Sequence, residues 1–377
     1  MVHHRVLMDT SARTYPQSAV SSRLDLFTHN NNEDTIMMSV LKKVSAITLA
    51  ASLTAGVASA QEVTLRLGHL WPAVSGNHLQ LMQVWADKVE ADSNGRIAVE
   101  VYPGGTLVPP TEQYSAVSNR IMDITATVQG YSANRFPLTQ IVELPGVSDS
   151  GKQGACILQS LYDEGHLDRE YTDTKPLFMF THGPGMFHVR GKDIRTPEDL
   201  RGMRIRRPTT VVGNILEQLG AQPVGMPAPE SYTAMQRGVI DGVALPWEGT
   251  IAFRLAELVE SHTSIGGMYT LAFIVTMNQD VYDRLSPANK AVIDANSGMD
   301  WAITGGEVFD RLDEAGIADA QAKGRTIIEI EGGVDNPAWA PAINAAREQY
   351  LNDLEGRNLP AREVYQRALE LRNSCAA

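Results

Sequence analysis

The sequence predicts an α/β fold of two lobes, joined by strands that cross between them. Segments with strand-like and helix-like patterns alternate, stop and then resume, which is typical of two α/β units. The chain of 377 residues is longer than a usual single domain, and 43% of it is hydrophobic, which is enough for a sizeable core. No internal repeat or low-complexity linker separates the two units, so we expect the lobes to be connected directly.

The first 60 residues are expected to lie outside the mature fold. From Met38 onward, two lysines precede an apolar run at 44–57, and small residues follow in an A-x-A pattern at 58–60. This order indicates a secretory signal peptide that is cleaved after Ala60. We interpret the segment 1–37 as the result of a start codon assigned too far upstream.

The first lobe is assigned to 61–184. Its first predicted strand places Val63, Leu65 and Leu67 on one face. Gly95 follows the first helix as a C-cap. The predicted strands are 63–71, 97–105, 121–130 and 176–183, and the predicted helices are 75–94, 110–120 and 151–169.

The second lobe is assigned to 185–270 and repeats the alternation. The helical turn after Thr196 has a threonine N-cap, then a proline and an aspartate three positions on, as in a capping box. The predicted strands are 186–191, 202–208, 221–226 and 240–247, and the predicted helices are 209–219 and 227–237.

The remaining segments are expected to complete both lobes. An apolar strand at 268–278 returns toward the first lobe, and the helical pattern at 286–324 would extend about 58 Å if it were continuous. A helix of that length, or a kinked pair of helices with the bend at Gly305 and Gly306, would run along both lobes. A strand at 325–333 and helices within 336–372 follow. The first lobe then gains about 271–310 and the second about 311–377.

The most informative stretch is GMRIRRPTT at 202–210. Alternation in a strand puts Arg204 and Arg206 on the same face, and the proline that follows ends the strand. Arg206 then lies at the carboxyl end of the strand, where open α/β sheets bind ligands. Its planar guanidinium suits a carboxylate. The pattern alone leaves open whether Arg206 is surface charge instead, which is our interpretation of Arg201 and Arg204.

Two longer stretches carry a family resemblance. RTPEDLRGMRIRRPTT and LGAQPVGMPAPESYTAMQRGVIDGVALPWE resemble the DctP-type solute-binding proteins of tripartite ATP-independent periplasmic (TRAP) transporters. The resemblance extends over nearly the whole mature chain. It implies a two-lobe periplasmic binding protein with a long helix along both lobes. It also implies capture of a small organic acid, delivery to a membrane permease, and a carboxylate clamp at Arg206.

Two positions depart from the members that bind sialic acid. Met186 and Leu245 stand where those members carry an arginine and an asparagine. The pocket is therefore expected to be more apolar. The expected ligand is a monocarboxylate with an apolar or aromatic body, or a 2-oxo or 2-hydroxy acid.

Further candidate ligand-binding residues lie near the predicted strand ends. Trp71 and Trp247 are candidates for pocket walls, and Glu248 for orienting Arg206 or accepting a ligand hydroxyl. Trp71 is as well explained by the core, and Thr209 by a helix N-cap. The other candidates are His69, Gln129, Thr209 and Phe273.

Composition and motifs exclude several functions. With 32 Lys+Arg against 44 Asp+Glu, the net charge of −12 argues against nucleic-acid binding. The sequence contains no catalytic elbow, P-loop or metal-ligand spacing, so we expect neither an enzyme nor a cofactor or metal. Two alternatives remain: a secreted α/β enzyme that uses Glu248 and a histidine, or a sensor that docks to a membrane receptor. A disulfide between Cys156 and Cys375 stays open at this point.

Overall fold

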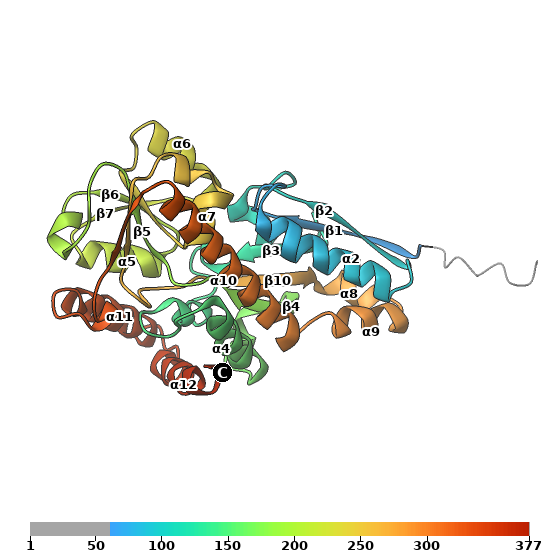
Figure 1. Ribbon diagram of the computed structural model, residues 1–377. Helices are drawn as coiled ribbons and strands as arrows, with labels where there is room; N and C mark the ends of the chain where they lie inside the picture. Colours follow the sequence, from blue (N-terminus) through green and yellow to red (C-terminus); the bar gives the residue numbers. More distant parts are fainter. Residues whose placement is uncertain (1–60, 377) are drawn as a thin grey trace, which may run out of the picture. The chain divides into compact units, whose positions relative to one another are not determined.

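A computed structural model describes residues 61–376, which contain two β-sheets surrounded by helices (Figure 1). The first sheet has five strands in the order β2-β1-β3-β10-β4, and the second has six in the order β11-β9-β5-β8-β6-β7. The predicted two-lobe α/β class is therefore confirmed. The predicted signal peptide and the segment before it fall outside the described residues. No helix within residues 61–376 is long and apolar enough to cross a membrane.

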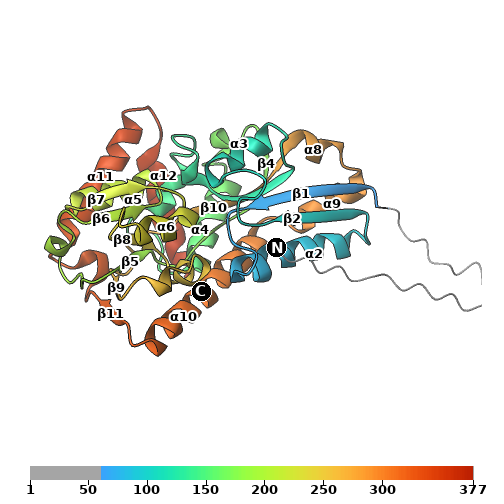
Figure 2. The ribbon, with the colours of Figure 1, turned by 90° about the horizontal axis from the view of Figure 1, so that it is seen from above.

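The first sheet combines parallel and antiparallel strands. β1 pairs in parallel with β2 and β3, whereas β10 is antiparallel to β3 and β4. Leu65 and Leu67 are completely buried, as the alternation predicted. The strands are β1 (Val63–His69), β2 (Ile97–Tyr102), β3 (Ile124–Val128), β4 (Thr174–Thr181) and β10 (Ala272–Asn278). Around them lie α2 (Gln83–Asp92), α3 (Gln113–Ser118), α4 (Gly151–Asp163) and α8 (Gln279–Arg284). Figure 2 shows β1 and β2 side by side.

The second sheet contains the arginine-rich strand near its edge. β6 pairs in parallel with β7 and β8, and β5 is antiparallel to β8 and β9. Its strands are β5 (Met186–Val189), β6 (Arg204–Arg207), β7 (Gln222–Gly225), β8 (Gly242–Leu245), β9 (Ser261–Ser264) and β11 (Thr326–Glu329). Its helices include α5 (Thr210–Gln218), α6 (Ser231–Gln236) and α7 (Trp247–Ala252).

Two elements of the second lobe differ from the sequence prediction. The predicted strand 240–247 ends at Leu245, and Trp247 begins helix α7 instead. The strand ends because Pro246 has no backbone N–H to donate to a neighbouring strand. Its backbone angles also fit the position just before a helix. Strand β9 was missed because its sequence, SHTS, has little apolar content.

The long helical segment forms two helices, which was one of the two expected arrangements. α9 (Pro287–Ala295) ends before Gly298, whose φ of 78° favours glycine, and α10 (Met299–Ala322) starts just after it. The break falls at Gly298 and not at Gly305 and Gly306, where the pattern had placed a bend. Both glycines lie inside α10, and a Cβ on Gly306 would clash with the backbone of α4. They allow close helix packing and do not interrupt the helix.

Helix α10 is tied to a helix of each lobe by two aspartates one turn apart. Asp310 accepts hydrogen bonds from the backbone N–H groups of Gly151 and Lys152 at the start of α4, at 2.6 and 2.9 Å. Asp313 accepts one from the backbone N–H of Glu248 at the start of α7, at 2.6 Å. A carboxyl group at a helix N-terminus satisfies free N–H groups there. This long helix therefore links both lobes, as the resemblance implied (Figure 1).

The C-terminal helices divide between the lobes. α11 (Ala340–Glu355) packs against α5, whereas α12 (Ala361–Ser374) packs against α4 beside the first sheet. The sequence prediction had grouped 311–377 with the second lobe. A disulfide between Cys156 of α4 and Cys375 fixes α12 in this place, with Cα atoms 5.7 Å apart.

Replacing both cysteines by alanine should lower the free energy of unfolding by roughly 2–4 kcal/mol, because the cross-link restricts the unfolded chain over 219 residues of sequence separation. Urea denaturation of the oxidised wild type and the double variant measures this difference. The wild type treated with reductant is the control and should match the variant. Equal stability of all three forms would contradict the prediction.

Candidate ligand-binding site

Arg206 is completely buried at the carboxyl end of β6. Its Nε donates to the carbonyl oxygen of Met226 at 3.0 Å, and its Nη1 to that of Ala244 at 3.1 Å. Its Nη2 donates to the hydroxyl of Tyr131 at 2.9 Å. Tyr131 belongs to the first lobe, so the contact joins the two lobes. These bonds fix the plane of the guanidinium.

The charge of Arg206 has no acidic partner among residues 61–376. Arg204, by contrast, pairs with Asp241 at 2.6 Å and is partly exposed, as expected of a surface charge. The three hydrogen bonds of Arg206 use three of the five guanidinium donors, which leaves two N–H groups. Because an unpaired buried charge is costly, the geometry suits an incoming anion that accepts both.

Arg206 faces a small cavity between the lobes. The cavity measures about 20 Å³, room for about one water-sized group. Most of its lining is apolar or aromatic. The lining residues are Leu70, Trp71, Val128, Tyr131, His182, Arg206, Ala228, Leu245, Pro246, Glu248, Phe253, Leu271, Phe273 and Phe309.

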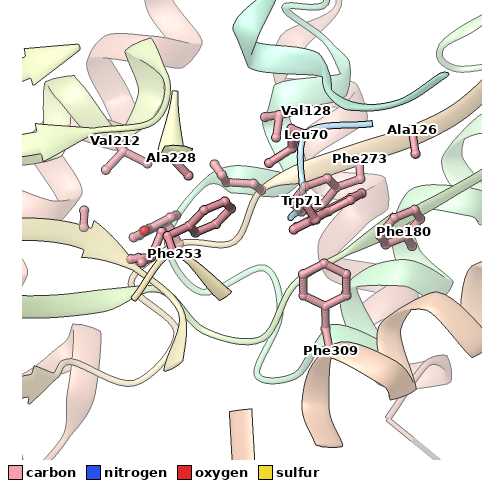
Figure 3. Packing of buried hydrophobic residues seen from close by; sticks show 14 of the residues in the cluster. Leu70, Trp71, Ala126, Val128, Phe180, Val212, Ala228, Phe253, Phe273 and Phe309 are labelled. Atoms are coloured by element: carbon pink, nitrogen blue, oxygen red, sulfur yellow. The ribbon is translucent and has the colours of Figure 1, made fainter. Parts of the chain in front are cut away.

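Aromatic residues are prominent in the cavity lining, and Figure 3 shows the rings of Trp71, Phe273 and Phe309 close to one another. The ring centroids of Trp71 and Phe273 lie 5.5 Å apart, and those of Phe273 and Phe309 lie 5.4 Å apart. Phe180 stacks on Phe273 from outside the cavity at 5.2 Å. Rings at such separations attract a further aromatic ring through offset or edge-to-face contacts.

Glu248 is the one carboxyl group that lines the cavity. It is buried, and its Oε1 has no hydrogen-bond partner among the described residues. Burial raises the pKa of Glu248 to about 8, the neighbouring charge of Asp313 adds to this, and the amide of Asn77 opposes it. Burial also raises the pKa of Asp313 to about 7. Glu248 therefore retains its proton at neutral pH.

His182 lines the cavity from the segment between β4 and β5. Burial lowers its pKa to about 3, and the charge of Arg206 contributes, so the ring is neutral. Its Nε2 has no partner among the described residues. No local pattern identified His182 as a cavity residue, because its position at the cavity depends on which segments pack around it.

Five of the ten predicted ligand-binding residues line the cavity. Arg206, Trp71, Leu245, Glu248 and Phe273 all face it, although they come from four separate segments of the chain. Tyr131, Phe253 and Phe309 complete the wall and were not among the ten. Phe309 lies on a long amphipathic helix, where an aromatic residue is ordinarily core.

Trp247 and Met186 do not line the cavity and pack together elsewhere. They form a small cluster with Ala320. The Trp247 ring lies 4.5 Å from His262 and 5.2 Å from His188, between centroids. Trp247 faces away because α7 begins at this residue, which breaks the alternation of the strand.

His69, Gln129 and Thr209 also lie outside the cavity lining. His69 hydrogen-bonds His78 at 3.0 Å between ring nitrogens, and Gln129 Nε2 donates to the hydroxyl of Tyr171 at 3.1 Å. Thr209 caps α5, and its hydroxyl donates to Glu143 of the first lobe at 2.7 Å. Thr209 therefore holds the lobes together and does not face the cavity.

The contacts between the lobes describe a closed arrangement. Arg206 and the backbone N–H of Ala228 both donate to Tyr131, and Thr209 donates to Glu143. A cavity of about 20 Å³ does not accommodate an organic acid unless its walls move apart. Access therefore requires separation of the lobes or rearrangement of the side chains that line them.

Residues 67–333 match the family model for the bacterial extracellular solute-binding proteins, family 7, named DctP. A solute-binding protein of Roseobacter denitrificans is 26% identical over 319 residues, which are 81% of this chain and 93% of that relative.

Two solved structures at higher identity resemble this chain. A TRAP solute-binding protein from Rhodoferax ferrireducens T118, in complex with copurified benzoate, is 33% identical with a TM-score of 0.80 and covers 83% of this chain and 98% of its own. A marine metagenome TRAP solute-binding protein specific for aromatic acid ligands, in complex with 3-hydroxybenzoate, is 34% identical with a TM-score of 0.81. That match covers 84% of this chain and all of the other.

The unliganded protein should lose stability as the pH rises from about 6.5 to 8.5. The raised pKa values of Glu143, at about 7, Glu248 and Asp313 mean that the folded state holds protons that the unfolded chain releases above about pH 4.5. The stability from these protons is fully present at low pH and is lost as the pH passes 7–8. Buried neutral histidines such as His69 and His182 have the opposite effect, because they make stability rise with pH, but only below about pH 6.5. Melting temperatures across this pH range measure the loss.

Changing Glu248 to Gln should make that loss smaller, because the amide carries no proton to release. Changing the exposed Glu90 to Gln serves as the control and should leave the pH profile unchanged. Identical profiles for the wild type and Glu248→Gln would show that the Glu248 carboxyl ionises as it would in water.

Proposed function

The chain belongs to family 7 of the bacterial extracellular solute-binding proteins, the DctP type of TRAP transporters, and on this basis we propose that it captures an aromatic monocarboxylate. Proteins of this kind bind small molecules and are not enzymes. They work with membrane permease subunits, and we propose a permease as the recipient of this ligand. We also propose that the chain reaches the periplasm through the signal peptide that ends at Ala60.

The observation that carries the proposal is the buried charge of Arg206. Its guanidinium is held in a fixed plane by three hydrogen bonds and has no carboxylate partner among the described residues. A ligand carboxylate would accept the two remaining N–H groups and neutralise the charge. Because the site is shielded from water, this ion pair would be stronger than one on the surface.

The walls of the cavity support an aromatic body for the ligand. Trp71, Phe273 and Phe309 surround the space next to Arg206, and Leu245 adds an aliphatic contact. The relatives from Rhodoferax ferrireducens and the marine metagenome, bound to benzoate and 3-hydroxybenzoate, point to the same class. A 2-oxo or 2-hydroxy acid without a ring would leave this aromatic wall without a partner.

The charges of the cavity support one carboxylate and disfavour two. Arg206 is the one cationic side chain that lines it, and Glu248 and the nearby Asp313 are both acidic. A second ligand carboxylate would be buried without a cation, which is costly. The proposed cycle is binding to the open form, closure around the ligand, and recognition of the closed form by the permease.

Changing Arg206 to Ala or Lys should raise the Kd for benzoate at least about thirtyfold, because loss of one partner of a buried charge pair costs about 2–5 kcal/mol. Lysine keeps the charge but cannot reproduce the planar fork. Isothermal titration calorimetry measures this. Arg204→Lys is the control, since that side chain is partly exposed and bound to Asp241, and its affinity should stay within about twofold of the wild type.

The wild-type protein should bind benzoate at least about tenfold more tightly than benzene-1,3-dicarboxylate. Competition measured by thermal shift or calorimetry tests this with the same preparation. Equal or tighter binding of the dicarboxylate would refute the single-cation account of the cavity. Absence of binding by every aromatic acid would refute the proposed ligand class. Conversion of a bound acid to a product would favour the enzyme alternative.

A further inference from the structure

Glu248 is a buried carboxyl group with one oxygen that no contact within the described fold uses, although the amide of Asn77 lies close enough to influence its pKa. Only 4% of the residue is exposed, and Oε1 has no hydrogen-bond partner among residues 61–376. Its backbone N–H is bound to Asp313, so the aspartate holds the start of α7 without engaging the side chain. A glutamate kept for structure is expected to hydrogen-bond a neighbour, as Glu170 does with Leu138 and Thr139.

Glu248 lines two hollows. It lines the cavity of Arg206, and it also lines a neighbouring pocket of about 240 Å³ formed by the loop 72–77, α7 and α10. The walls of that pocket include Val74, Ile251 and Leu312. When Arg206 binds the carboxylate of a ligand, the ring of that ligand would therefore contact Glu248 where the cavity borders the larger pocket.

The charges around Glu248 favour a hydrogen bond between its protonated carboxyl group and an uncharged group of the ligand. Asp313 approaches from α10, Arg206 faces the same cavity from β6, and neutral His182 faces it from the segment between the sheets. Neither Glu248 nor Asp313 forms a salt bridge in the described part of the chain. A protonated carboxyl group offers one O–H donor and acceptor oxygens, which match a hydroxyl group.

We propose that Glu248 is a specificity-determining residue that binds a hydroxyl substituent on the ring of the monocarboxylate held by Arg206. The inference rests on the proposed function and adds a second polar contact to it. Hydroxylated aromatic monocarboxylates are then the preferred ligands. Benzoate itself leaves the buried Glu248 oxygen without a partner, which is unfavourable in a closed cavity.

Calorimetric titration of the wild-type protein with benzoate and with 2-, 3- and 4-hydroxybenzoate tests the inference. One isomer should bind about tenfold more tightly than benzoate, the gain expected of one buried hydrogen bond. If benzoate binds and no hydroxylated isomer binds better, this inference fails while the proposed function stands. If none of the four acids binds, the proposed function fails and the inference fails with it.

Two variants at the same position assign the preference to Glu248. Glu248→Met has a similar length without polar groups, so it should reduce the ratio between the Kd of benzoate and the Kd of the best isomer to less than about twofold. Glu248→Gln is the matched control, because its amide still donates and accepts, and should retain most of the preference. A preference that survives Glu248→Met overturns the assignment. The assignment would also be overturned if His182→Phe abolished the preference and Glu248→Met did not.

A crystal structure of the wild type with the best-bound isomer decides the question even if a variant fails to fold. The ring hydroxyl should lie within about 3.2 Å of a Glu248 carboxyl oxygen, with the ligand carboxylate on Arg206. A hydroxyl that contacts His182 or solvent instead would overturn the inference.

Discussion

The positive charge of Arg206, buried without an acidic partner in the described chain, is the constraint on which the site depends. A guanidinium in this position is stable only if its donors are used and its charge is eventually neutralised. Two backbone carbonyls and Tyr131 use three donors and leave a fork for a carboxylate. The apolar walls around it exclude water, so the same burial that makes the free charge costly makes a bound anion favourable.

The link between the lobes follows from the same arrangement. Tyr131 of the first lobe reaches Arg206 of the second, and Thr209 reaches Glu143 in the opposite direction. Asp310 and Asp313 fix α10 to one helix of each lobe, so the two halves share this helix. Closure therefore shapes the cavity, and a ligand that bridges the two halves stabilises the closed form.

The other ionisable groups of the cavity are kept neutral. Burial keeps the proton on Glu248 and keeps His182 without one, so the cavity presents one charge beside uncharged polar and aromatic surface. This favours a ligand with one carboxylate and a ring. Specificity in such a site depends on the groups that are left without partners, since each favours a ligand that satisfies it.

The sequence by itself determined the alternation of strands and helices, the two-lobe class and the position of Arg206 at a strand end. These features depend on local periodicity and on single turn residues, which the sequence contains directly. Tertiary structure alone decided that Phe309 and His182 line the cavity, that Trp247 faces away after Pro246, and that Cys156 pairs with Cys375. Those outcomes depend on how segments far apart in the chain pack together, and a local pattern does not contain that information.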